Sequence, residues 1–164
     1  MPSPERTRGM RVEDPKGEKA PATLLIVEDD PEMRAVLKDF LEREGHRVIP
    51  EASGERAIAA VESERIDAVI LDKEMPGMSG LDFLSFVRHR FPGTPVILIT
   101  AFGGSRVAEE AFRRGAAGYL EKPFRVADLL RAVRGVIEAG HARSSPRGVE
   151  PSRCQPGGHS GIAS

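Results

Sequence analysis

Five short apolar runs alternate with five segments of helical periodicity along most of this 164-residue chain. The runs are rich in Val, Ile and Leu and are bounded by turn-forming residues, as is typical of strands buried in a parallel sheet. The intervening segments repeat apolar residues at every third or fourth position, which predicts helices with one buried face. This alternation favours a doubly wound α/β fold, with helices on both faces of the sheet and right-handed crossovers.

Local start and stop signals set the bounds of these elements. Asp30, Ser53 and Ser79 are typical helix N-caps, and Gly45 is expected to end the first helix. The predicted strands cover residues 23–27, 46–50, 68–71, 95–99 and 117–120. The predicted helices cover about 31–44, 54–62, 80–90, 105–114 and 126–140.

Composition restricts the class of protein. Residues 1–21 and 141–164 are rich in Pro, Gly, Ser and charge, so we expect disordered tails around one folded domain at residues 22–140. The single cysteine, Cys154, excludes an internal disulfide framework and favours a cytoplasmic location. No apolar run has the length of a signal peptide core or a membrane span. The net charge is −1 and the middle of the chain is mildly acidic, which argues against a nucleic-acid partner because binding nucleic acid usually needs a basic face.

Polar side chains stand where four of the predicted strands end. In open parallel sheets, ligands bind outside the carboxyl ends of the strands, so these side chains are expected to meet at one rim. Three acids follow the first strand, and an acid, a hydroxyl and an amine follow the third, fourth and fifth: Glu28, Asp29, Asp30, Asp72, Thr100 and Lys122.

These residue types together indicate a phosphate-accepting site. Clustered carboxylates repel one another unless a cation neutralises them, and Mg²⁺ prefers oxygen ligands of the kind that Glu28, Asp29 and Asp72 offer. An aspartate can attack phosphorus and form an aspartyl phosphate. Lys122 and the Thr100 hydroxyl are suited to bind the remaining phosphoryl oxygens.

Each residue also has a simpler interpretation. Asp72 on its own fits a turn after a strand, and Asp30 fits a helix cap. Lys122 fits a surface lysine, Thr100 an ordinary strand residue, and Tyr119 a half-buried residue of an edge strand. Their joint occurrence at the ends of one sheet favours the functional interpretation.

Four segments carry a resemblance to a known family. The segments IVEDDPEMR, LDKEMPGMSG, PVILITAFG and GYLEKPF, in this order, resemble the receiver domain of two-component response regulators, over about residues 23–140. The resemblance is to the stand-alone, chemotaxis-regulator type. It implies a flavodoxin-like (βα)5 fold with strand order 2-1-3-4-5.

The resemblance also implies a metal site. Asp72 is then the phosphoacceptor, Asp29 a direct Mg²⁺ ligand and Glu28 an acid that acts through water. The backbone carbonyl of Glu74 completes the metal ligands, and no other cofactor is implied. Glu28 is longer than the aspartate common in the family, and Lys73 and Glu74 add charges beside the acceptor.

A second group of residues is implied to act as a switch. Thr100 and Lys122 are the switch hydroxyl and the switch lysine. Tyr119 is the aromatic residue that changes rotamer together with Thr100. The Lys122–Pro123 peptide bond is expected to be cis, so that the lysine amine points at the phosphoryl group.

The function implied is signalling rather than enzymatic turnover. A sensor histidine kinase or a histidine phosphotransfer protein donates the phosphoryl group, and a downstream protein of unknown identity responds. We expect no nucleic-acid or membrane partner, a monomer or weak dimer, and no DNA-binding output domain after Gly140.

Three other functions stay open at this stage. A nucleotide or flavin site is disfavoured, because carboxylates after the first strand repel phosphate. A phosphatase with an aspartate nucleophile is suggested by the acid pair Asp72 and Glu74, and repeated turnover of phosphate esters would identify it. A module that keeps the fold without phosphorylation is distinguished by a labelling assay.

Overall fold

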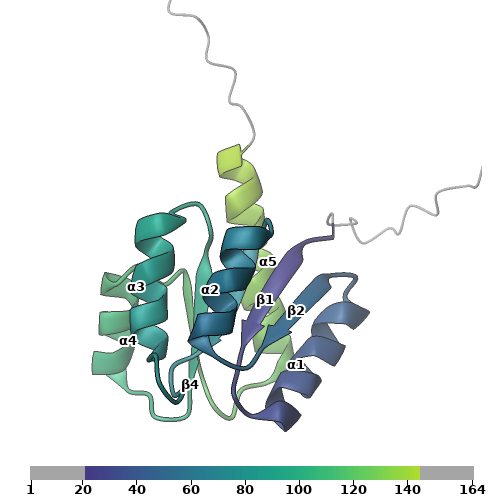
Figure 1. The fold of residues 1–164 in the computed structure, drawn as a ribbon. Helices are drawn as coiled ribbons and strands as arrows, with labels where there is room; N and C mark the ends of the chain where they lie inside the picture. Colours follow the sequence, from purple (N-terminus) through teal and green to yellow (C-terminus); the bar gives the residue numbers. More distant parts are fainter. Residues whose placement is uncertain (1–20, 145–164) are drawn as a thin grey trace, which may run out of the picture.

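The computed structural model describes residues 21–144, which form one five-stranded parallel sheet with helices on both faces (Figure 1). The strand order is β2-β1-β3-β4-β5, which confirms the predicted fold class. The elements are β1 (Thr23–Val27), α1 (Pro31–Arg43), β2 (Arg47–Glu51), α2 (Gly54–Ser63), β3 (Ala68–Asp72), α3 (Gly80–Arg90), β4 (Val96–Thr100), α4 (Ser105–Arg113), β5 (Gly118–Glu121) and α5 (Val126–Ser144). Most of both predicted disordered tails lies outside the described residues.

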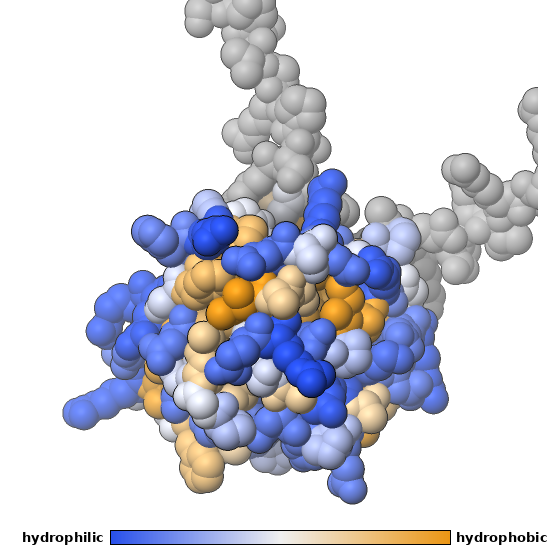
Figure 2. Space-filling view, viewed as in Figure 1, coloured by the Kyte–Doolittle hydropathy of each residue, from blue (hydrophilic) through white to orange (hydrophobic). Residues whose placement is uncertain are grey.

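Alternate side chains of the strands point to opposite faces of the sheet and pack into two apolar cores. On one face, β1 residues such as Leu25 and Val27 pack with α2, α3 and α4, and on the other face Leu24 and Ile26 pack with α1 and α5. Figure 1 shows α2 and α3 in front of the sheet and α5 behind it. The same view in space-filling form is mostly hydrophilic, with the strongest apolar colour in the upper middle of the domain and paler apolar areas elsewhere (Figure 2).

Four strands end one residue later than the sequence indicates. The ladder continues because the Lys73 N–H donates to the Ile99 carbonyl at 2.8 Å and the Lys122 N–H donates to the Thr100 carbonyl at 2.8 Å. Asp72 and Thr100 are therefore the last residues of β3 and β4 rather than loop residues. Backbone pairing therefore fixes the main-chain position of both candidate residues.

The helix caps follow the sequence signals, with one exception at α5. The side chains of Asp30, Ser53 and Ser79 each accept a backbone N–H in the first turn of the helix that they precede. Gly45 has φ +92 just after α1. The prediction that disorder starts at residue 141 is wrong, because α5 continues through Gly140 to Ser144. A glycine inside a helix costs only about 1 kcal/mol, too little to end it here.

No helix within residues 21–144 combines the length and the apolar content that crossing a bilayer requires.

Candidate functional site

Three acidic side chains meet at the carboxyl end of the sheet. The neighbouring strands β1 and β3 bring Glu28, Asp29 and Asp72 together, with carboxylate oxygens that all lie within 4.8 Å of one another. Glu28 is 2% exposed and Asp72 is 4% exposed, whereas Asp29 is exposed to solvent. The structure thus gathers the acids that the sequence analysis selected for a metal.

Lys122 supplies the positive charge in this cluster. Its Nζ lies 3.0 Å from Glu28 Oε2 and 3.6 Å from Asp72 Oδ2. Burial alone lowers the pKa of Lys122, but the hydrogen bond to Glu28 and the charges of Glu28 and Asp72 outweigh it and leave the pKa raised. The peptide bond from Lys122 to Pro123 is cis.

Asp72 is poorly stabilised as an anion without a metal. Burial, followed by the hydrogen bond and the charge of Glu28, raises the pKa of Asp72 well above its ordinary value, and Lys122 offsets only part of this. Lys122 pairs with the two buried carboxylates of Glu28 and Asp72, and Asp29 adds a third, exposed carboxylate to the cluster. This surplus of negative oxygen donors fits a hard divalent cation such as Mg²⁺, which takes carboxylate and carbonyl ligands and retains water.

The loop after β1 is held by a residue that the sequence analysis did not select. Arg34 Nη1 donates to the carbonyls of Glu28, at 2.7 Å, and Asp29, at 3.3 Å. The Asp30 N–H donates to Glu28 Oε1 at 3.2 Å. Arg34 is one of several polar residues on α1, so nothing in its spacing marked it.

A glycine lets α3 start directly behind Asp72. A Cβ at Gly80 would lie 2.5 Å from the Asp72 carbonyl oxygen and 2.6 Å from Lys73 Cα. Real Cβ atoms do not approach backbone this closely, so a side chain at this position would displace β3 or α3. Close approach, rather than a turn, explains glycine here.

Thr100 is engaged by the side chain of Glu74. The Thr100 hydroxyl is fully buried and donates to Glu74 Oε1 at 2.5 Å, while the Ala101 N–H donates to Glu74 Oε2 at 3.2 Å. Burial raises the pKa of Glu74, but these two hydrogen bonds and the charge of Lys73 outweigh it and leave the pKa lowered. The sequence analysis placed the Glu74 carbonyl on the metal and its carboxylate beside Asp72, but local pattern does not show that this carboxylate reaches β4.

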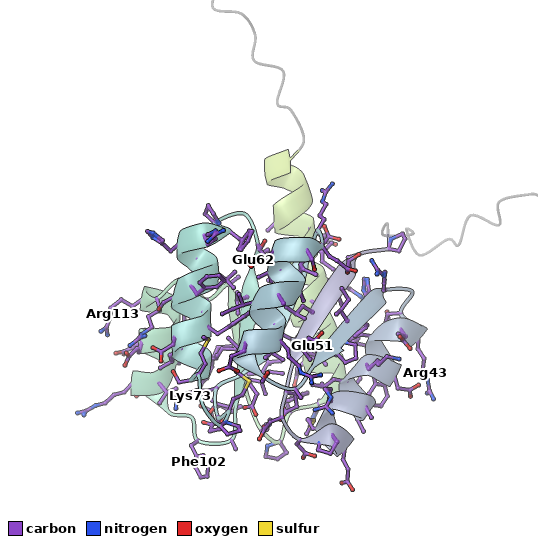
Figure 3. All side chains as sticks on the ribbon, in the orientation of Figure 1. Arg43, Glu51, Glu62, Lys73, Phe102 and Arg113 are labelled. Atoms are coloured by element: carbon purple, nitrogen blue, oxygen red, sulfur yellow. The ribbon has the colours of Figure 1, made fainter. Side chains whose placement is uncertain are left out.

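The loop after β4 presents an apolar side chain to solvent. Phe102 is 74% exposed, and its ring points away from the domain at the same rim where Lys73 lies (Figure 3). Its backbone N–H nevertheless faces inward and donates to Thr100 Oγ1 at 3.0 Å.

Tyr119 is tied to a neighbour on its own strand. Its hydroxyl donates to Glu121 Oε1 at 3.1 Å, and the Gly104 N–H donates to the same oxygen at 2.9 Å. Burial and then Glu121 raise the pKa of Tyr119. The sequence held a signal for this pair, because residues two apart on a strand share a face.

The sequence pattern of the response regulator receiver domain matches residues 24–134. The chain therefore belongs to the receiver domain family of two-component response regulators. Among solved structures, it is similar to a CheY-like receiver domain protein from Methanospirillum hungatei, with 26% identity, a TM-score of 0.72 and coverage of 76% of this chain and 99% of that one. The response regulator TrrA from Thermotoga maritima, solved with Mg²⁺ and BeF, is 33% identical with a TM-score of 0.65, over 70% of this chain and 98% of that one.

Longer proteins also contain a similar region. The response regulator protein FleR of Pseudomonas aeruginosa is 40% identical over 138 residues, which are 82% of this chain and 29% of that protein. The transcriptional regulatory protein CpxR of Escherichia coli K12 is 36% identical over 118 residues, 72% of this chain and 50% of that protein. This chain spans half the length of these curated relatives or less.

Proposed function

We propose that Asp72 accepts a phosphoryl group from a sensor histidine kinase or a histidine phosphotransfer protein. The observation that carries this proposal is the placement of Asp72: it is 4% exposed, it lies 3.6 Å from Lys122, and its carboxylate shares one 4.8 Å cluster with Glu28 and Asp29. A buried carboxylate with a raised pKa beside a lysine and further acids is typical of a functional site.

The transfer requires one bond to form and one to break. An Asp72 oxygen attacks phosphorus, and the bond from phosphorus to the donor's histidine nitrogen breaks, so that the nitrogen keeps the electron pair. Lys122 then offsets the added negative charge, and the Thr100 hydroxyl donates to a phosphoryl oxygen. The transferred group stays on Asp72 instead of being released in each cycle.

Mg²⁺ fits the acidic cluster, with Asp29 and Asp72 as direct ligands, Glu28 acting through water, and the Glu74 carbonyl as a further ligand. When bound, Mg²⁺ neutralises negative charge on the transferred group. The similar protein TrrA was solved with Mg²⁺ and BeF, which supports the same ligand chemistry here.

Phosphorylation is proposed to change the contacts of Thr100 and Tyr119 and thereby the binding of a downstream protein. The receiver family implies a kinase as phosphodonor, and a cytoplasmic monomer or weak dimer is consistent with that role. A phosphatase reaction is less well supported. The pKa of Glu74 is lowered and its carboxylate already accepts two hydrogen bonds, so it is unsuited to donate a proton as a general acid at neutral pH.

Labelling with acetyl phosphate in the presence of Mg²⁺ tests the assignment. Asp72→Asn is expected to abolish labelling, because an amide does not attack phosphorus. Asp67→Asn, which changes the acid just before the same strand, is the matched control and should label like the parent. Labelling of Asp72→Asn at the parent level would contradict the proposal, and so would release of many equivalents of phosphate from simple esters.

A further inference from the structure

The carboxylate of Glu74 bridges the ends of two neighbouring strands. Its residue begins in the loop after β3, where the Glu74 N–H donates to Asp72 Oδ1 at 3.2 Å. Its carboxylate ends at β4, where it accepts from the Thr100 hydroxyl at 2.5 Å and from the Ala101 N–H at 3.2 Å. Lys73 Nζ, 3.5 Å from Glu74 Oε1, stabilises this position of the side chain.

This contact uses the only hydrogen that the Thr100 hydroxyl has to donate. A hydroxyl carries one donor and two acceptor lone pairs. The Phe102 N–H occupies an acceptor position at 3.0 Å, and Glu74 takes the donor. Thr100 therefore cannot donate to a phosphoryl oxygen on Asp72 while Glu74 holds it.

We propose that the Glu74 carboxylate is an internal competitor of the phosphoryl group for the Thr100 hydroxyl. Glu74 then determines how readily the site accepts and holds a phosphoryl group on Asp72. The inference rests on the proposed function and adds to it a residue whose carboxylate has no assigned role. When Glu74 occupies the Thr100 donor, the site can bind a phosphoryl group fully only in the molecules in which that donor is free. The apparent affinity for the phosphoryl group is then the intrinsic affinity multiplied by this fraction.

Three substitutions separate competition for the hydroxyl from simple charge repulsion. Glu74→Ala removes both the charge and the acceptor. Glu74→Asp keeps the charge but shortens the side chain by one methylene, so that it no longer spans from the β3 loop to Thr100. Glu74→Gln removes the charge but keeps an oxygen that can accept from Thr100.

The probe is beryllofluoride with Mg²⁺, titrated by calorimetry into the parent and the variants. If Glu74 leaves Thr100 free in a minority of molecules, Glu74→Ala and Glu74→Asp should bind beryllofluoride about fivefold more tightly than the parent, and Glu74→Gln by less than about twofold. Glu55→Gln is the matched control. Its exposed carboxylate lies beside Gly77 in the loop that follows Asp72, and we expect parent affinity from this variant.

The amide NMR signal of Ala101 provides a second readout that needs neither metal nor phosphate. It should shift in Glu74→Ala and Glu74→Asp, since both lose the acceptor of the Ala101 N–H. An unchanged signal in both folded variants would overturn the inference. Equal affinities for beryllofluoride in the parent and all variants would also overturn it. So would tighter binding by Glu74→Ala and Glu74→Gln with none by Glu74→Asp, because that pattern results from charge repulsion alone. A parent that neither binds beryllofluoride nor is labelled would refute the proposed function itself.

Discussion

Asp67 and Asp72 stand at opposite ends of β3 and have opposite surroundings. Asp67 Oδ2 accepts from the Thr23 N–H at 2.8 Å, and the Asp67 N–H donates to the Thr23 carbonyl at 2.8 Å. Asp72 accepts one backbone N–H, from Glu74, and otherwise faces Glu28 and Lys122. Asp67 directly precedes β3 and Asp72 ends it, and of these two carboxylates the first completes the backbone hydrogen bonding while the second lies in a cluster of charges.

The direction of the strands explains this difference. The amino ends of parallel strands present N–H groups, and carboxylates and imidazoles can accept hydrogen bonds from them. His46 Nδ1, for example, accepts a hydrogen bond from the Ala22 N–H at 3.2 Å. The carboxyl ends present carbonyls, which donate nothing, so acids there accept N–H groups only from the loops that follow the strands, and Glu28 and Asp72 also pair with Lys122. Asp67 and His46 therefore stabilise the fold at the amino end, whereas at the carboxyl end the ionisation of Asp72 opposes it.

The largest stability effect is expected from Lys122→Met. It leaves Glu28 and Asp72 buried without their cation, and breaking a buried ion pair in this way costs about 3 kcal/mol of unfolding free energy. Urea unfolding at pH 8 without Mg²⁺ measures it. Lys38→Met is the control, because Lys38 and Glu42 form a pair with side chains 40% and 44% exposed, worth less than about 0.5 kcal/mol. Equal losses in the two variants would show that Lys122 is not needed to balance the acids.

Asp72→Asn is expected to raise the free energy of unfolding, in contrast to Lys122→Met. The pKa of Asp72 is raised in the folded state, so its contribution to stability is complete below its unfolded pKa and is lost as the pH rises through the folded value. The neutral amide avoids that loss, and we expect a gain of about 2 kcal/mol at pH 8 without Mg²⁺, after allowance for solvent screening.

Two measurements sharpen this prediction. The gain from Asp72→Asn should shrink as the pH is lowered toward 4, and it should shrink at pH 8 when Mg²⁺ is added, because the metal stabilises only the aspartate. If Asp72→Asn is less stable than the parent at pH 8, the surroundings of Asp72 do not disfavour its ionised form.

Asp67→Ala should lower the unfolding free energy by about 1.5 kcal/mol, the typical loss for a hydrogen bond to a charged group. Asp67→Asn keeps an acceptor for the Thr23 N–H and should lose less than Asp67→Ala. Neither change should affect phosphorylation. If Asp67→Ala stabilised the protein as Asp72→Asn is expected to do, the contrast between the two ends of β3 would be wrong.

The smallest effect concerns His46. Burial and Arg134 lower its pKa, although Glu44 and Asp67 act in the other direction. A lowered folded pKa means that its contribution to stability is present above the unfolded value of His and is lost as the pH falls below it. Between pH 7.5 and 5.5 the parent should lose about 0.5 to 1 kcal/mol more than His46→Gln, since protonation removes the Nδ1 acceptor. Parallel pH profiles would contradict this.

Much of the fold was predictable because its signals are local. The caps at Asp30, Ser53 and Ser79 were found from residue type and from the apolar pattern that follows each one. The errors are local as well. β3 is one residue longer than predicted because its pairing with β4 extends to Asp72, and β2, β4 and β5 begin and end one residue later than predicted. Helix α5 passes through Gly140 because the rest of the helix outweighs one glycine.

The sequence by itself determined which residue types stand at the strand ends: acids after β1 and β3, a hydroxyl at β4 and a lysine after β5. Only the tertiary structure decided their partners. Lys122 pairs with Glu28, which lies 94 positions away, and Glu74 takes the Thr100 hydroxyl across 26 positions. Strand order sets these neighbours, and the final contact depends on the reach and rotamer of each side chain. Neither quantity is encoded in local propensity, which reports only on residues a few positions apart.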